Sequence, residues 1–218
     1  MRETFTHEYL NQECLPDDIS CGVCLSNKGS FRCMDCFGQA LFCHSCCIKA
    51  HSSLPFYSIE RWTGEFFIKT SLNAEGFILH LGHGGILCPA NVSAPEPTED
   101  RECDEMNEVL LEAWEPRDTR ALVIVDVLKV HQLKVSWCCC KGAPGHEIQL
   151  FHHHLFPASI SRPSTAFTFA VLNYFHVDAV ECKTSASNFF SKLRCLTDFA
   201  SPQSVPVSRF HPILLEMF

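Results

Sequence analysis

Pairs of cysteines, followed by a histidine, dominate the first quarter of the chain. Seven possible metal ligands lie within about thirty residues: Cys21, Cys24, Cys33, Cys36, Cys43, Cys46 and His51. Two thiolates separated by two residues can bind one tetrahedral Zn²⁺ from a tight turn, so such pairs are typical of structural zinc sites. The seven donors predict two zinc sites with one ligand to be found. Because the segment is too short to build a core alone, we expect metal binding to supply its folding free energy.

The number of residues between the cysteine pairs distinguishes one type of zinc module from another. Six residues separate Cys36 from Cys43, whereas a RING places its second and third ligand pairs nearly next to each other. The spacing resembles a B-box or ZZ-like cross-brace. That arrangement implies one zinc bound by the first and third pairs and a second zinc bound by the other donors, that is, Cys21, Cys24, Cys43 and Cys46 for the first and Cys33, Cys36 and His51 for the second.

A disulfide framework is the alternative explanation of the cysteine pairs. Disulfides need an oxidising compartment, but residues 1–20 contain six charged side chains and no apolar segment of a secretory signal. Fifteen cysteines without such a signal favour an intracellular, reducing environment and metal binding.

A glycine-rich loop and the end of a predicted strand offer a third set of donors. His83 and Cys88 lie in the loop, and Cys138 and Cys140 form a CxC motif after the strand. Residues i and i+2 of an extended chain lie on the same face, so both CxC sulfurs can bind one metal while Cys139 points away. The four donors predict a third site of the Cys₃His type. The alternative for His83 is a histidine that only hydrogen-bonds within its loop.

The remaining sequence predicts an α+β protein in which a small zinc module precedes a β-hairpin-plus-helices domain. We expect a lead-in at 1–17, the zinc module at 18–62 and the hairpin and helical region at 63–218. Two runs rich in β-branched residues predict the hairpin, at 122–127 and 130–137. We expect three helices to follow, one from Glu147, one capped by Ser164 or Thr165, and one over 184–196.

The net charge of −8 comes from one segment. Residues 96–118 hold ten acidic and two basic residues, and we expect a solvated acidic insertion at about 95–119, with a protein-interaction patch as the alternative. A basic footprint is the usual signature of nucleic-acid binding, so the charge does not support strong DNA binding by this chain alone. The sequence contains no apolar run of about eighteen residues, and we expect no association with a membrane.

Several further motifs, taken together, resemble the CxC-type cysteine-cluster domain associated with Kyakuja–Dileera–Zisupton (KDZ) transposases. The matching segments extend from about residue 18 to 215 and are 21–62, 81–89, 137–140, 149–150, 155–158 and 165–169. The resemblance implies a nuclear, zinc-binding accessory module that lies N-terminal to a DDE-type catalytic domain. It also implies a role in DNA-end recognition or in assembly of the transposition complex, with transposase protomers, other proteins or DNA as partners.

The chain departs from this family at two positions. Tyr57 stands where the family usually has a second histidine, and a phenol is a poor ligand near its usual pKa of about 10. Cys47, His44 or water are the alternatives for the eighth ligand. Leu128-Lys129 replaces the Asn-Gly turn that favours a hairpin. Because the sequence also ends before a DDE domain, we expect a C-terminally truncated fragment, or a decayed or domesticated copy.

Three classes of function follow from these features. The first is a non-catalytic zinc-binding accessory module of a KDZ-like transposase, and the second is a B-box-like protein-interaction module in a regulatory protein. The third, an enzyme, is not favoured, because the well-spaced cysteines serve as ligands and no general base has a recognisable place near an open metal position. We assign no catalytic residue and expect Zn²⁺ as cofactor, with two ions in the zinc module and a third at the CxC motif.

Overall fold

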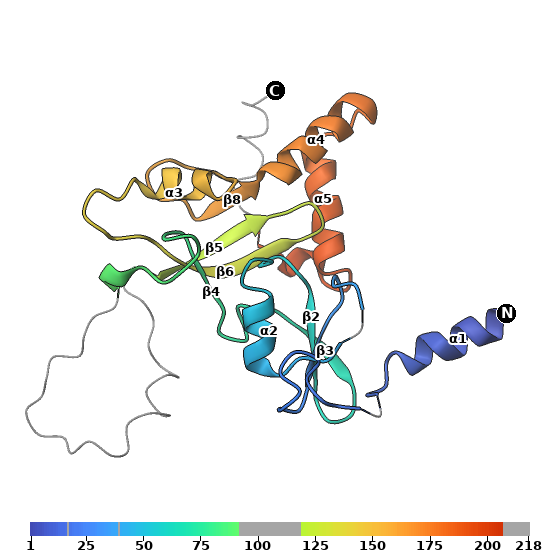
Figure 1. Cartoon of the computed structure of the whole chain (residues 1–218). Coiled ribbons are helices and arrows are strands. Elements are labelled where there is room, and N and C mark those ends of the chain that lie inside the picture. Colours follow the sequence, from blue (N-terminus) through green and yellow to red (C-terminus); the bar gives the residue numbers. More distant parts are fainter. Residues whose placement is uncertain (17, 39, 92–118, 207–218) are drawn as a thin grey trace, which may run out of the picture. The chain divides into compact units, whose positions relative to one another are not determined.

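The structure, a computed structural model, describes residues 1–16, 18–38, 40–91 and 119–206. Helices and sheets are both present, as expected for an α+β protein (Figure 1). The contacts divide the chain into two compact units, Met1–Phe77 (unit 1) and Ile78–Phe218 (unit 2). The expected domain boundary at residue 62 stays a prediction. Apart from Thr119, the expected acidic insertion at about 95–119 lies outside the described residues.

Unit 1 contains two helices and a three-stranded antiparallel sheet. Its elements are α1 (Arg2–Asn11), β1 (Phe31–Cys33), α2 (His44–Ala50), β2 (Ile59–Trp62) and β3 (Phe67–Thr70). The strand order is β1-β2-β3. The core is small, and its buried hydrophobic residues other than cysteine are Phe31, Leu41, Phe42, Ile59, Leu72 and Phe77. So few apolar side chains make an additional source of stability necessary in a unit of this size.

The lead-in expected at residues 1–17 is solvated but not irregular. Residues 2–11 form α1, in which no residue is buried. The sequence did not indicate this helix because it has no apolar stripe, the main signal by which a helix is recognised.

A buried arginine fixes the register of β1 beside the second cysteine pair. Arg32 is 5% exposed and lies opposite Glu60 on β2, whose carboxylate accepts a hydrogen bond from Arg32 Nε at 2.8 Å. Arg32 also donates to Glu13 at 3.1 Å, which links the residues after α1 to the sheet. Since a slip of one residue would separate this ion pair, the pairing keeps Cys33 opposite Ile59.

Unit 2 is built on a five-stranded mixed sheet in the order β4-β6-β5-β8-β7. Its elements are β4 (Ile78–His80), a 3₁₀ turn (Pro89–Asn91), β5 (Thr119–Val125), β6 (Val130–Ser136), α3 (His146–His152), β7 (Leu155–Pro157), β8 (Thr165–Thr168), α4 (Phe169–Glu181), α5 (Ala186–Thr197) and a second 3₁₀ turn (Pro202–Ser204). The antiparallel pairing of β5 with β6 confirms the predicted hairpin. By contrast, β4 pairs with β6, and β8 with β5, in parallel.

The helix that we expected to be capped by Ser164 or Thr165 begins later. Residues 165–168 form strand β8, in which all four residues are buried. A strand buried on both faces lacks the apolar–polar alternation by which strands are recognised, and this segment was therefore read as the start of the helix. The cap is Thr168, whose hydroxyl accepts from the Val171 N–H at 3.1 Å and donates to Asp126 at 2.7 Å.

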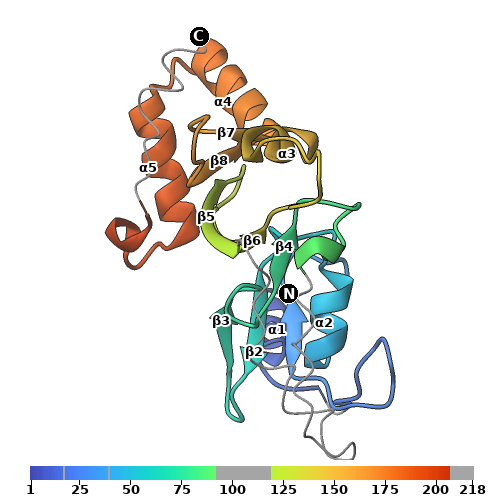
Figure 2. The ribbon, with the colours of Figure 1, turned by 90° about the vertical axis from the view of Figure 1, so that its left-hand side faces the viewer.

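Two helices contact strands of unit 2 and supply seven of the eleven residues of its buried cluster. Helices α4 and α5 lie side by side in both views (Figures 1 and 2). Their contact includes Phe175 and Phe189, whose ring centroids are 5.0 Å apart. These side chains belong to a buried cluster that also contains Phe167 from β8 and Leu193 from α5. No helix in the described part of the chain is long and apolar enough to cross a membrane.

Candidate metal centres

Three groups of cysteine and histidine side chains converge in the described part of the chain. Within each group the ligand atoms lie within 4.8 Å of one another. We call them site 1 (Cys21, Cys24, Cys43 and Cys46), site 2 (Cys33, Cys36 and His51) and site 3 (His83, Cys88, Cys138 and Cys140). Sites 1 and 2 lie in unit 1, and site 3 lies in unit 2. The structure therefore gathers the predicted ligands into the groups expected from the sequence.

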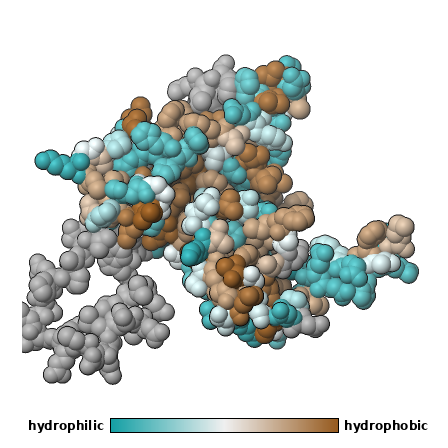
Figure 3. Space-filling view, in the orientation of Figure 1, coloured by the Kyte–Doolittle hydropathy of each residue, from teal (hydrophilic) through white to brown (hydrophobic). Residues whose placement is uncertain are grey.

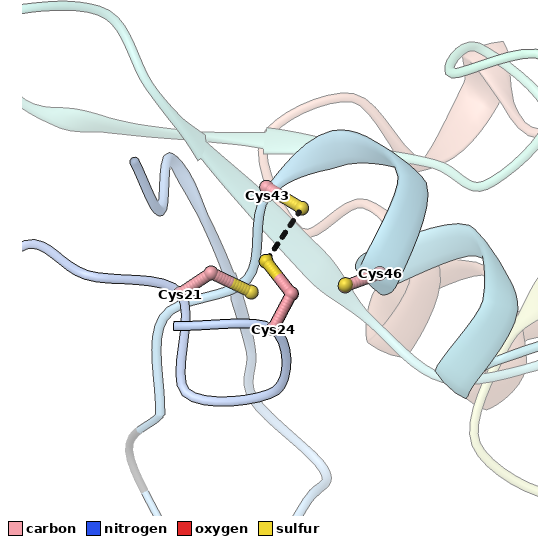
Figure 4. A group of neighbouring side chains, drawn as sticks. All are labelled: Cys21, Cys24, Cys43 and Cys46. Carbon is pink, nitrogen blue, oxygen red and sulfur yellow. Dashed lines mark hydrogen bonds between the residues drawn. The ribbon is translucent and has the colours of Figure 1, made fainter. Parts of the chain in front are cut away.

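Site 1 joins a tight turn to the start of α2. The turn at Cys21 and Cys24 is closed by a hydrogen bond from the Leu25 N–H to the Cys21 carbonyl at 2.9 Å. Cys43 is the N-cap of α2, and Cys46 follows within the first turn of that helix. The four sulfurs point toward one another (Figure 4), and the Cys24 and Cys43 sulfurs are 3.9 Å apart.

The spacing of the sulfurs fits a metal ion and not a disulfide. Zn–S bonds of about 2.3 Å place the sulfurs of a tetrahedral site about 3.8 Å apart. In site 1 the Cys24 and Cys43 sulfurs are 3.9 Å apart, and in site 3 the Cys88 sulfur lies 3.8 Å and 3.6 Å from those of Cys138 and Cys140. A disulfide bond is about 2.05 Å long, and the fourteen described cysteines are all free.

Thiol pKa values within site 1 are shifted in opposite directions by the close approach of the sulfurs and their hydrogen-bond partners. A hydrogen bond from the Ser45 hydroxyl and one from the Cys46 N–H lower the pKa of Cys43 to about 6. The hydrogen bond between Cys46 and Cys43, together with burial, raises the pKa of Cys46 to about 12. A bound dication favours the ionised form of every ligand, so metal binding removes this conflict.

Site 2 is formed by the end of β1, the turn after it and the end of α2. Cys33 is the last residue of β1, and His51 is the C-cap of α2. His51 Nδ1 lies 2.8 Å from the Cys47 carbonyl oxygen and therefore donates to it. Nε2 is then the free acceptor of the ring, and it lies 3.5 Å from Cys36 Sγ. A backbone carbonyl that fixes the tautomer in this way is typical of metal-binding histidines.

Cys47 and His44, the two side chains considered for the eighth ligand, both lie outside site 2. The Cys47 sulfur is 3.9 Å from His51 Nδ1, the nitrogen that does not face Cys36. Burial raises the pKa of the Cys47 thiol to about 12, which disfavours the thiolate. His44 Nε2 lies 3.0 Å from the Glu75 carbonyl oxygen. Neither side chain belongs to the site 2 group.

Site 3 brings the glycine-rich loop onto the end of β6. His83 has a φ of 50°, and its Nε2 lies 3.4 Å from the sulfurs of both Cys138 and Cys140. Zn–N and Zn–S bonds of about 2.0 and 2.3 Å would place these atoms about 3.5 Å apart. A Cβ atom at Gly82 would lie 2.8 Å from the Cys138 Cβ, so the close packing of this loop requires glycine.

A buried glutamine holds the CxC backbone of site 3. Gln149 on α3 is 3% exposed. Its Oε1 accepts from the Cys138 N–H at 2.8 Å, and its Nε2 donates to the Cys138 carbonyl at 3.1 Å and to the Pro144 carbonyl at 2.9 Å. On the other side, Asn91 Nδ2 donates to the Trp137 carbonyl at 2.8 Å. The Gln149 amide thus pairs with the Cys138 backbone as a neighbouring strand would, where β6 has ended.

Comparison with known families locates a match in unit 2. Residues 111–201 match a family model. The family is CxC2, described as "CxC2 like cysteine cluster associated with KDZ transposases". This match confirms the recognised resemblance over these residues. No curated protein and no solved structure matches the chain.

The CxC2 match contains the CxC motif and its supporting glutamine. Cys138, Cys140 and Gln149 lie inside residues 111–201, whereas His83 and Cys88 precede them. Sequence reasoning noted the Gln149-Leu150 pair but gave Gln149 no role, because nothing in one sequence shows which backbone an amide will contact. The structure adds it as a positioning residue for site 3.

Replacing Gln149 with leucine is expected to weaken metal binding at site 3 about 10- to 100-fold, the usual effect of removing a residue that orients a metal ligand. The reason is that the Cys138 peptide loses both of its side-chain hydrogen bonds. Native mass spectrometry of the full chain at increasing chelator concentration measures the release of each metal. Gln132→Leu, at an exposed position on β6, is the matched control. A release curve for Gln149→Leu identical to that of the control would contradict the proposed role.

Proposed function

We propose that this chain is a zinc-binding accessory module of a KDZ-like transposase and that it binds three Zn²⁺ ions without catalysing a reaction. One observation carries the proposal: Cys138 and Cys140 lie within the CxC2 match, and the structure surrounds them with two further donors at tetrahedral spacing. Sites 1 and 2 show sulfur–sulfur and sulfur–nitrogen separations of the same kind.

The donor atoms favour zinc over other metals. All three groups consist of cysteine and histidine, without a carboxylate. Tetrahedral sulfur and nitrogen ligands are typical of structural zinc, whereas calcium and magnesium prefer oxygen. The interleaved order of ligands in unit 1, with the first and third pairs in one site and the second pair with His51 in the other, supports a B-box or ZZ-like cross-brace.

Charge and exposed apolar residues favour protein assembly as the physical role of the module. Apolar side chains are exposed around the first two cysteine pairs: Val23, Leu25, Met34 and Phe37. Figure 3 shows hydrophobic residues on the visible face of the lobe that carries α2 and β2. Exposed apolar patches mark interaction sites, and the net charge of −8 opposes binding to the phosphate backbone. We infer contact with transposase protomers in the nucleus, with DNA engaged weakly.

A B-box-like protein-interaction module without a role in transposition is the second candidate. The same exposed side chains in unit 1 favour it, and the CxC2 match lies in unit 2. The two proposals differ in the partner that the module binds.

The proposal is tested by expressing the full chain with zinc, counting bound metals by native mass spectrometry, and adding a KDZ transposase catalytic domain. We expect three zinc ions, a complex with the catalytic domain, and DNA binding whose affinity changes little with salt concentration. Cys182→Ser, at an exposed cysteine outside the three groups, should retain three zinc ions. A folded chain that binds no zinc would refute the metal proposal. Failure to bind the catalytic domain would favour the second candidate. If DNA binding depended steeply on salt concentration, the physical role of the module would be DNA engagement and not protein assembly.

A further inference from the structure

Site 2 differs from the other two sites in the number of its ligands. In the part of the chain that the structure describes, sites 1 and 3 each contain four donors, whereas site 2 contains three. Zinc takes four ligands in structural sites, and a zinc ion with three protein ligands keeps a position for an external molecule. Among the three sites, site 2 therefore differs in needing a fourth ligand besides its three described donors.

Three described side chains that could donate to this site have other partners. Cys47 and His44 lie outside the group, as described above. Asp35, which lies within the second cysteine pair, accepts a hydrogen bond from the Ser58 N–H through its Oδ2 atom. That hydrogen bond holds the carboxylate against the backbone of the following segment.

Residue 57 lies beside the ligands of site 2. The Ser58 carbonyl accepts from the Met34 N–H at 2.9 Å, and the Ser58 N–H donates to Asp35. Both hydrogen bonds place the 57–58 backbone against the turn that carries Cys33 and Cys36. The ring of Tyr57 packs on His51, with 6.0 Å between the ring centroids. Structural zinc takes cysteine, histidine, aspartate and glutamate as ligands, so we take Tyr57 to border the site without completing it.

Charge and exposure make site 2 accessible to an anionic ligand. Two thiolates and one neutral imidazole balance the charge of a bound Zn²⁺, whereas four thiolates in site 1 and three in site 3 give negatively charged complexes. Cys33 and His51 are buried, but Cys36 and Tyr57 are only half-buried, and the neighbouring Phe37 is fully exposed. An external ligand can therefore approach on the Cys36 side without meeting a net negative charge.

We propose that site 2 is an open metal site that binds a small thiol as its fourth ligand, at a position beside Tyr57. This inference rests on the proposed function, because it requires a metal at Cys33, Cys36 and His51. A thiolate is the class of ligand that the borderline-soft Zn²⁺ already takes from this chain. The thiol loses its proton to solvent as its sulfur takes the fourth position, and no electron is transferred.

The test uses the full chain loaded with Co²⁺ in place of Zn²⁺ and kept reduced with a phosphine. Native mass spectrometry first establishes that three metal ions are bound. Titration with 2-mercaptoethanol is then expected to increase the sulfur-to-cobalt charge-transfer absorbance until one thiol is bound per chain. Sites 1 and 3 already have four protein ligands and should not respond. Cys36→Ser should lose one metal and the response together.

Tyr57→His gives a sharper test, because an imidazole at this position can supply the missing ligand. We expect this variant to keep three metals, to lose the thiol response, and to release its site 2 metal at higher chelator concentration. Tyr174→His adds the same imidazole on α4, at an exposed position, and should respond as the unmodified chain does.

The possible failures can be told apart. Three bound metals without a thiol response would overturn the open site while leaving the proposed function intact. If Cys36→Ser still showed the absorbance response, the thiol would be binding at another site, and the inference would be overturned. A full response in Tyr57→His would overturn the placement beside residue 57. If the unmodified chain bound two metals and Cys36→Ser also bound two, both the inference and the metal count of the proposed function would be overturned.

Discussion

Replacing Cys43 with serine is expected to remove the metal from site 1 and to unfold unit 1. The apparent binding free energy of a structural zinc is about 10–16 kcal/mol at pH 7, as large as the whole stability of a typical domain, about 5–15 kcal/mol. Unit 1 has few buried apolar side chains with which to offset such a loss. Cys43 is buried and occupies the N-cap position of α2 without a side-chain capping hydrogen bond, so a metal bound there would be the link between the start of the helix and the turn at Cys21 and Cys24.

Native mass spectrometry and ¹H–¹⁵N correlation spectra of the full chain measure this effect. We expect Cys43→Ser to bind fewer metals and the amide signals of residues in unit 1 to lose their dispersion. Signals from unit 2 should stay in place, because its buried cluster is made by residues of that unit alone. Cys14→Ser removes an exposed thiol that lies in none of the three groups and serves as the matched control. Dispersed unit 1 signals in metal-depleted Cys43→Ser would show that the apolar core is sufficient without site 1.

The grouping of the candidate ligands could be predicted because local geometry restricts it. A C-x₂-C pair places two sulfurs on one turn, so only the pairing of the turns with each other remained open, and the resemblance to a B-box or ZZ-like cross-brace implied it. Cys138 and Cys140 could be assigned to one group because an extended chain places residues i and i+2 on one face. Which backbone groups a buried side chain would contact was not predicted, including the support of Cys138 by Gln149 from α3.

The strands of unit 2 likewise divide into those that the sequence predicted and those that it did not. The β5–β6 hairpin was predicted from two adjacent runs of β-branched residues. Strands β4 and β8 were not predicted, because each is only three or four residues long and pairs in parallel with a strand distant in sequence. Segments as short as these carry no periodicity by which they could be recognised. Their place in the sheet depends on tertiary pairing.

Replacing Phe189 with alanine is expected to have the largest effect on unit 2. Phe189 on α5 is 0% exposed and contacts Phe175 of α4, so truncation leaves a cavity between the two helices. Phenylalanine-to-alanine substitutions in a core cost about 3–5 kcal/mol, a large part of the stability of a typical domain. Site 3 should lose its metal in the same unfolding transition, because Cys138 and Cys140 follow strand β6 of this sheet.

Urea unfolding followed by the fluorescence of the buried Trp137 measures this destabilisation, in a background where Trp62 and Trp114 are replaced by phenylalanine. We expect the midpoint to fall by an amount equivalent to about 3–5 kcal/mol. Phe199→Ala, which removes a ring that is 87% exposed, is the matched control and should change the unfolding free energy by less than about 0.5 kcal/mol. If both variants unfolded at the same urea concentration, the α4–α5 contact would not be the source of unit 2 stability. The metal at site 3 would then be the stronger candidate for that role, as the metal at site 1 is for unit 1.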